Sequence, residues 1–138
     1  MDTLAVAGRH DLTDTQWAAL EALRGAQDSV TMMVREFQKR RDVIVERLNT
    51  IPGIRCLKPE GAFYVFPNIA GLIGKSANGK KLTSPCDVAD YLLDEAKVAG
   101  VPGEDFGSQR HIRFSYATSL ADIEKGCRRI ADAVAQLA

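Results

Sequence analysis

The sequence of 138 residues has no long apolar run, no excess of charge of either sign, and few cysteines. No run approaches the roughly 18 apolar residues of a membrane-spanning helix, and no secretory signal pattern is present, so we predict a cytoplasmic protein without a membrane partner. Basic and acidic residues number 18 each, which gives no strong field to attract nucleic acid. The three cysteines are odd in number and widely spaced, which fits reduced thiols better than disulfides or a zinc site.

Several common catalytic patterns are missing as well. The two histidines, His10 and His111, are too isolated in the sequence to suggest metal ligands. The run 74–76, Gly-Lys-Ser, resembles the end of a phosphate-binding loop, but Ile69 stands where that pattern needs glycine, and no buried strand precedes it. No serine–histidine–aspartate or cysteine–histidine grouping has a supporting context. We therefore assign no metal-binding, cofactor-binding or catalytic residue.

What the sequence does contain is an alternation of helix and strand patterns. Four helices are predicted, at 14–23 after a cap at Thr13 or Asp14, at 28–49, at about 85–96, and from Ser119 to the C-terminus. Four strands are predicted, at 54–57, 62–66, 98–101 and 111–116, and the first two look like a hairpin. Residues 68–84 show no strong period and are predicted to form a surface loop. This order predicts an α/β fold, a two-layer sandwich of helices on a small, largely antiparallel sheet.

The spacing of apolar residues predicts which side chains face the core. In the helix at 28–49 the apolar stripe consists of Val30, Met33, Val34, Phe37, Val45 and Leu48. In the last helix the inward residues are Ile123, Cys127, Ile130, Val134 and Leu137, and in the helix before it Val88, Tyr91, Leu92 and Cys86. Glu124 and Arg128 are spaced for an ion pair along the last helix.

The most informative single residue is Arg113, which lies on a predicted strand after a glycine-rich turn. Neighbouring strand residues point to opposite faces, so Arg113 shares a face with His111 and Ser115. A guanidinium at such a place can hold a carboxylate with two hydrogen bonds. From the residues alone, a structural ion pair with Glu104 or Asp105 is the commoner arrangement.

Three motifs then give the chain a family resemblance. They are Pro-Glu-Gly-Ala-Phe-Tyr at 59–64, Val-Pro-Gly-Glu-Asp-Phe-Gly at 101–107, and Ile-Arg-Phe-Ser-Tyr-Ala-Thr at 112–118. With these motifs in family order and at family spacing, the chain resembles the C-terminal small domain of class I aminotransferases of the bacterial aspartate aminotransferase type. We accordingly divide the chain into an atypical N-terminal leader at 1–15 and an aminotransferase small domain at 16–138.

The resemblance implies a pyridoxal-phosphate-dependent transfer of an amino group between an amino acid and a 2-oxo acid. It also implies that Arg113 binds the α-carboxylate of the substrate, which reverses the preference for a structural ion pair. In the family, the lysine that forms a Schiff base with the cofactor belongs to a large domain, and the motif around that lysine is absent from these residues. We therefore expect the chain alone to bind the cofactor poorly and to be inactive as a transaminase.

Two other interpretations stay open. The first alternative is a non-catalytic module that binds carboxylates or docks onto a full-length aminotransferase. In addition, the apolar surface on which the large domain would pack favours a homo-oligomer if it is exposed. Residues 7–17 resemble the start of certain insertion-sequence transposases, which suggests a truncated gene with a foreign start, or a chance likeness. No basic helix-turn-helix follows this stretch, so we expect no DNA binding.

Overall fold

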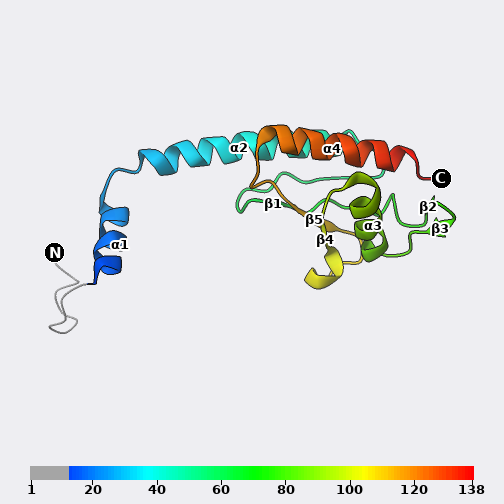
Figure 1. The fold of residues 1–138 in the computed structure, drawn as a ribbon, viewed down its shortest axis with the longest axis horizontal. Coiled ribbons are helices and arrows are strands. Elements are labelled where there is room, and N and C mark those ends of the chain that lie inside the picture. Colours follow the sequence, from blue (N-terminus) through cyan, green and yellow to red (C-terminus); the bar gives the residue numbers. More distant parts are fainter. Residues whose placement is uncertain (1–12) are drawn as a thin grey trace. The chain divides into compact units, whose positions relative to one another are not determined.

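The computed structural model of the chain describes residues 13–138 (Figure 1). The transposase-like stretch at 7–17 and the leader at 1–15 lie largely outside the described residues, and both stay predictions. The chain forms two units, the residues up to Met33 and Val34–Ala138, and each is described by itself. In the part from residue 13 onward, no helix combines the length and the apolarity that crossing a membrane requires.

Helix α1, Asp14–Arg24, begins and ends where the sequence predicts. The Thr13 hydroxyl accepts a hydrogen bond from the backbone N–H of Gln16, and the Gln16 side chain accepts one from the N–H of Thr13, which completes a capping box. The N–H of Gly25 donates to the carbonyl of Glu21 and closes the last turn. The local sequence thus fixes this helix, although none of its residues is buried.

Helix α2, Asp28–Asn49, also has its predicted bounds, but only part of its predicted apolar stripe is covered. Ile44 and Leu48 are buried and contribute to the core. Phe37 and Val45 pack against the core and are partly buried. The residues of the stripe that are exposed are Val30, Met33 and Val34. The prediction of a continuous inward face was wrong for the first half of the helix, because an apolar period does not by itself supply a packing partner.

A three-stranded antiparallel sheet has the order β1-β5-β4 (Figure 1). Its strands are β1 (Tyr64–Val65), β5 (Ile112–Ser115) and β4 (Val101–Pro102). The register places Tyr64 opposite Ser115 and Val101 opposite Arg113, so the strand with the arginine is the central one. The largely antiparallel sheet was predicted correctly, and it puts Arg113 between two neighbouring strands.

The predicted hairpin of strands 54–57 and 62–66 is not formed. The second segment pairs with β5, and of the first only Arg55 makes a bridge, to Asn68. Beside Cys56, a side chain takes the place of a neighbouring strand. The side-chain amide of Asn49 donates to the Cys56 carbonyl and accepts from the Cys56 N–H, both at 2.9 Å. Because the backbone groups of adjacent strand residues point to opposite edges, these bonds cover the edge that faces away from Asn68.

The segment 68–84 is more ordered than the predicted surface loop. It buries Ile69, Leu72, Ala77 and Leu82, and it forms a small hairpin of β2 (Ser76–Ala77) and β3 (Lys80–Lys81). Asn78 and Gly79 form the turn with φ of 50° and 79°, the left-handed conformation that tight hairpin turns use. Ser76 also exchanges two backbone hydrogen bonds with Ala138, which ties the C-terminus to this hairpin.

The remaining helices were predicted closely. Helix α3, Pro85–Tyr91, is capped by Ser84 and continues as a π-helical turn at Leu92–Ala96. It buries Val88, Tyr91 and Leu92 as expected, whereas Cys86 is exposed. Helix α4, Leu120–Ala135, is capped by Ser119 and buries all of its predicted inward residues, and Leu137 is buried just beyond its end. Glu124 does not pair with Arg128; it lies 3.8 Å from Arg47.

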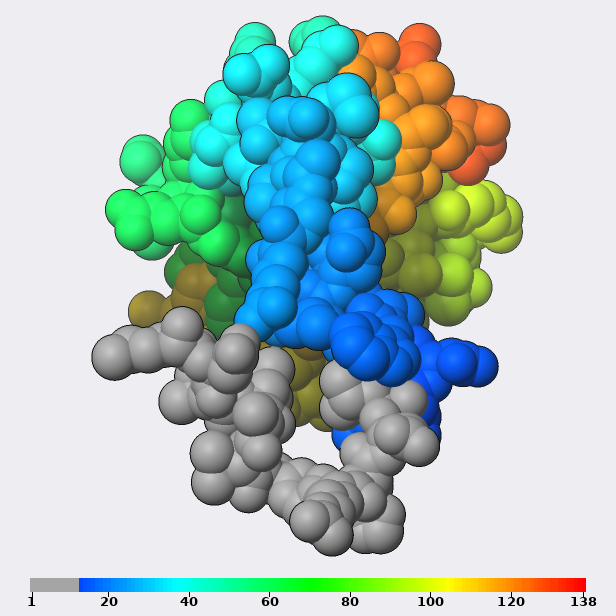
Figure 2. All heavy atoms as spheres, turned by 90° about the vertical axis from the view of Figure 1, so that its left-hand side faces the viewer, coloured from blue at the N-terminus to red at the C-terminus, as the bar shows by residue number. Residues whose placement is uncertain are grey.

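Helices and sheet of the second unit form the two layers of the predicted α/β fold. Helix α4 runs beside the second half of α2 in both views (Figures 1 and 2). Below them, Ile112 and Phe114 of β5 share one core cluster with Ile44 of α2 and Ile123 of α4. The helices therefore cover the sheet face that carries Ile112 and Phe114, and Arg113 points to the other face.

Candidate functional site

Strand β5 shows the alternation that the sequence predicts. Ile112 and Phe114 are buried, whereas Arg113 is half-buried and Ser115 is exposed. Tyr116, beyond the end of the strand, is buried like Ile112 and Phe114. The arginine is therefore kept out of the apolar core and remains partly accessible to solvent.

The guanidinium of Arg113 packs against two aromatic rings. Its Cζ atom is 4.4 Å from the ring centroid of Tyr64 on β1 and 4.5 Å from that of Phe106. Phe106 ends the short 3-10 helix Gly103–Phe106 that follows β4. Both distances are within the range of a cation–π interaction. The two rings thus hold the side chain from two separate segments of the chain.

The structural ion pair that the residues alone favoured is not formed. Within the described part of the chain, no carboxylate oxygen lies within 4.0 Å of the Arg113 guanidinium. Glu104 instead accepts a hydrogen bond from the thiol of Cys86 at 2.7 Å. That carboxylate raises the pKa of Cys86 to about 11, so this exposed thiol is a weak nucleophile at neutral pH. Asp105 is exposed.

The glycine-rich turn that carries Phe106 depends on close backbone packing. The N–H of Gly103 donates to the carbonyl of His111, and the N–H of Ser108 donates to the carbonyl of Gly103, both at 2.8 Å. A Cβ atom on Gly103 would lie 2.5 Å from the carbonyl oxygen of His111, so only glycine fits. Gly107 then reverses the chain with φ of 74°. This geometry fixes the position from which Phe106 reaches Arg113.

Further rings extend the site along the same part of the sheet. The ring of Phe66 meets that of Phe106 edge-on at 5.9 Å and stacks on His111 at 4.8 Å. The hydroxyl of Ser108 lies 2.6 Å from Nδ1 of His111. We call Tyr64, Phe66, Phe106, His111 and Arg113 the Arg113 site. Sequence reasoning found the arginine and the shared face of His111, but it missed the two covering rings.

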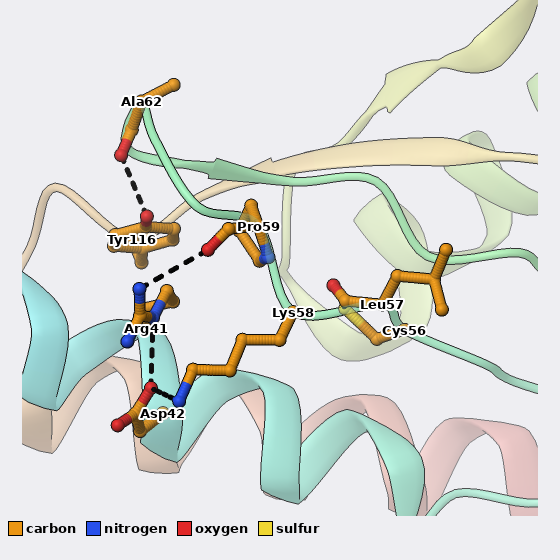
Figure 3. Close-up of polar contacts among 8 residues, drawn as sticks. All are labelled: Arg41, Asp42, Cys56, Leu57, Lys58, Pro59, Ala62 and Tyr116. Atoms are coloured by element: carbon orange, nitrogen blue, oxygen red, sulfur yellow. Dashed lines mark hydrogen bonds and ion pairs between the residues drawn. The ribbon is translucent and has the colours of Figure 1, made fainter.

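A second network holds the motif loop at 59–62 that precedes Tyr64 (Figure 3). The hydroxyl of Tyr116 donates to the carbonyl of Ala62 at 2.8 Å, and Arg41 donates to the carbonyl of Pro59 at 3.3 Å. Ala62 has φ of 59°, a conformation that such bonds help to maintain. The polar contacts of α2 thereby fix the entry to β1 and, through it, the place of Tyr64.

The same network contains a shared carboxylate. Oδ1 of Asp42 is 2.9 Å from both Nζ of Lys58 and Nε of Arg41 (Figure 3). Hydrogen bonds from Lys58 and Arg41 lower the pKa of Asp42 below its ordinary value of 3.8. The carboxylate therefore stays ionised at neutral pH and holds both cations beside the loop.

Comparison with known proteins shows which family the chain is similar to. A sequence model of the family described as aminotransferase class I and II matches residues 12–130. The probable aspartate/prephenate aminotransferase of Rhizobium leguminosarum bv. phaseoli is 48% identical over 116 residues, which are 83% of this chain and 29% of that protein. The crystal structure of the Rhizobium meliloti aspartate aminotransferase matches at 44% identity with a TM-score of 0.87, over 90% of this chain and 31% of that one. An aspartate aminotransferase from Thermus thermophilus, solved with maleate, matches at 36% identity with a TM-score of 0.71, over 86% and 29% of the two chains.

The chain belongs to the class I and II aminotransferase family. Within that family its relatives are aspartate/prephenate aminotransferases, and it spans only 29% of the length of the first of them. Enzymes of this family transfer amino groups between amino acids and 2-oxo acids and depend on pyridoxal phosphate.

The lysines of the described residues make no contact with the Arg113 site. Across residues 13–138, no hydrogen bond or ion pair joins a lysine to a residue of that site. Lys58 pairs with Asp42, Lys80 lies near Asp87, and Lys97 donates to a backbone carbonyl. A pocket of about 360 Å³ beside α4 has both apolar and charged lining residues, among them Lys97 and Lys125, and its lining does not include Arg113.

Proposed function

We propose that residues 16–138 form the small domain of an aminotransferase and that Arg113 binds the α-carboxylate of the amino acid or 2-oxo acid substrate. The observation that supports this most is the state of the guanidinium, which is half-buried, covered by two rings, and without an ion-pair partner in the described part. Five N–H donors lie in its plane, and two of them match the two oxygens of a carboxylate.

We further propose that these 138 residues alone do not transaminate. The reaction requires a lysine that forms a Schiff base with the cofactor, and in the described residues no hydrogen bond or ion pair joins a lysine to the Arg113 site; Lys58, Lys80 and Lys97 have partners elsewhere. We expect this lysine to lie in the part of the relatives' length that this chain does not span. In this proposal Arg113 orients the substrate, and the adjoining rings reduce access of water to its carboxylate.

A cytoplasmic location is part of the same proposal. The three cysteines, Cys56, Cys86 and Cys127, are all free thiols in the structure. Burial raises the pKa of Cys56 and of Cys127 to about 11, so these two thiols stay protonated and unreactive. This pattern suits a reducing compartment.

A titration of the 138-residue chain with maleate tests the carboxylate proposal, because a relative was solved with this dicarboxylate. Calorimetry with maleate, 2-oxoglutarate and aspartate should show saturable binding. Arg113→Ala should weaken it by about tenfold or more, since hydrogen bonds to charged groups are worth about 1.5–3 kcal/mol. Arg113→Lys should be intermediate, because it keeps the charge and loses the planar fork.

The matched control is Arg110→Ala, which removes an exposed guanidinium just before β5. It should leave binding unchanged, and circular dichroism should show that every variant is folded. Wild-type affinity in Arg113→Ala, or an absence of binding at millimolar maleate, would reject the proposal. Coupled transamination above background by the wild-type chain would reject its second part.

The second candidate is a module that docks onto a full-length aminotransferase or onto a second copy of itself. It is supported by the exposed apolar side chains at the start of α2, among them Met32 and Met33, and by Leu57, which is 89% exposed. Sedimentation of the chain alone and with a full-length aspartate aminotransferase tests it. A monomer in both samples would reject this candidate and leave the assignment of Arg113 untouched.

A further inference from the structure

We propose that Tyr64 and Phe106 are positioning residues that hold the Arg113 guanidinium in place and leave its N–H donors open to a carboxylate. This inference rests on the proposed carboxylate-binding function and adds two residues to it.

The sheet register brings Tyr64 to the arginine. Tyr64 lies opposite Ser115, and Arg113 is two positions before Ser115 on the same strand. A diagonal neighbour of this kind shares the sheet face and is within reach of an aromatic side chain. The contact of 4.4 Å between guanidinium and ring is therefore a consequence of strand pairing and does not depend on a mobile loop.

Phe106 approaches the same guanidinium from the turn after β4. Its position depends on Gly103, whose backbone packs against the carbonyl of His111, and on Phe66, whose ring meets it edge-on. Two independently held rings thus bind one cation, at 4.4 and 4.5 Å. The arrangement joins Tyr64 of β1 to Phe106 and Arg113, which lie on the far side of about 40 intervening residues and are themselves seven residues apart.

Arg40 also contacts an aromatic ring, but its other partner differs from those of Arg113. Its Cζ atom lies 5.4 Å from one ring, that of Phe37, and its Nε donates to the carboxylate of Glu36 at 3.0 Å. Arg40 therefore has one ring and a carboxylate, whereas Arg113 has two rings and, in the described residues, no carboxylate. The donors of Arg113 are left for a ligand.

The geometry of guanidinium explains what the two rings accomplish. Its N–H donors all lie in one plane, and a cation–π contact with a ring does not use up these donors. With two ring centroids within 4.5 Å of its Cζ atom, the guanidinium offers a planar ligand little room to stack. A carboxylate can still approach in the plane and form two parallel hydrogen bonds, and the adjacent rings lower the local dielectric and strengthen those bonds.

The test uses the 138-residue chain with maleate as the probe. NMR resolves the Nε–Hε signal of Arg113, which the ring currents of adjacent aromatic side chains shift. Tyr64→Leu and Phe106→Leu should each move this signal in the absence of ligand and weaken maleate binding about threefold to tenfold. Tyr64→Phe keeps the ring and should restore most of the affinity that Tyr64→Leu loses.

Phe37→Leu is the matched control, because it removes the ring from Arg40. It should move the Nε–Hε signal of Arg40 and leave that of Arg113 in place. Unchanged Arg113 signals in both leucine variants would overturn the inference, and so would wild-type maleate affinity in both. If the wild-type chain binds no maleate, the proposed function fails, while the ligand-free signals still decide whether the rings hold the guanidinium.

Discussion

Arg41 and Arg113 lie in the same unit, each beside a glycine-containing loop, yet their guanidinium groups are used differently. Arg41 donates to the carbonyl of Pro59 and to the carboxylate of Asp42, so its donors serve the loop at 59–62. Arg113 is covered by Tyr64 and Phe106 and pairs with no carboxylate in the part of the chain described. The first arginine stabilises the fold, and we propose that the second is kept available for a ligand.

The difference indicates which of the two guanidinium groups has hydrogen-bond donors available to a ligand. An arginine that is structural meets its partners inside the molecule, because a half-buried charge without partners costs stability. Where aromatic faces replace those partners, the charge is stabilised but its hydrogen-bond donors are not consumed. The two loops are also stabilised by different contacts. Side-chain hydrogen bonds fix the loop at 59–62, whereas backbone hydrogen bonds fix the turn at Gly103.

Gly103→Ala is expected to have the largest effect on the fold. The new Cβ would meet the backbone at 2.5 Å, so the turn must shift at a cost of about 3 kcal/mol, and Phe106 should leave Arg113. Chemical denaturation measures the loss. Gly107→Ala is the control, because its Cβ meets nothing within 4 Å and only the positive φ penalises it, by about 1–2 kcal/mol. Equal costs would contradict the role of close packing at Gly103.

Arg41→Ala should mainly lower stability, whereas Arg113→Ala should mainly lower maleate affinity. Arg41→Ala removes two hydrogen bonds from the loop and should lower the free energy of unfolding by about 1–2 kcal/mol, with maleate affinity within about twofold of wild type. Arg113→Ala should lose maleate binding and change stability by about 1 kcal/mol or less. Denaturation and calorimetry on both variants make the comparison. Similar profiles for the two variants would remove the distinction between them.

The smallest expected effect is a pH dependence at Asp42. Its pKa in the folded chain is below the ordinary value of 3.8, so its contribution to stability is present above that value and is lost as the pH falls through the folded pKa. The difference between the melting temperatures at pH 6 and pH 3 should therefore be smaller in Asp42→Asn than in the wild type. The same drop in both proteins would show that Asp42 contributes nothing to the loop.

Much of the fold could be predicted because its determinants are local. Thr13 and Ser119 cap their helices through short-range hydrogen bonds, and the inward positions of α4 repeat with the helical period. The failures were non-local. The segment at 62–66 pairs with the distant strand β5 and not with its neighbour at 54–57, and the burial of Ile69, Leu72, Ala77 and Leu82 within 68–84 depends on contacts with other parts of the chain.

The candidate site, too, could be predicted from the sequence only in part. The face of Arg113 follows from strand alternation, and its proposed role from a family motif. The contact with Tyr64 follows from pairing with a distant strand, and the contact with Phe106 from the backbone packing of a turn, neither of which a single sequence displays. The alternating aromatics at 63–66 were the available indication for Tyr64, whereas Phe106 had only its place in the glycine-rich turn.

The central claim is that Arg113, and not Arg41, is free to bind a carboxylate. The most direct measurement follows the Nε–Hε signals of both arginines in one NMR titration of the wild-type chain with maleate. We expect the Arg113 signal to shift progressively and saturate, while the Arg41 signal stays in place because Asp42 and Pro59 already occupy its donors. A shift of the Arg41 signal alone, or of neither signal, would contradict the claim.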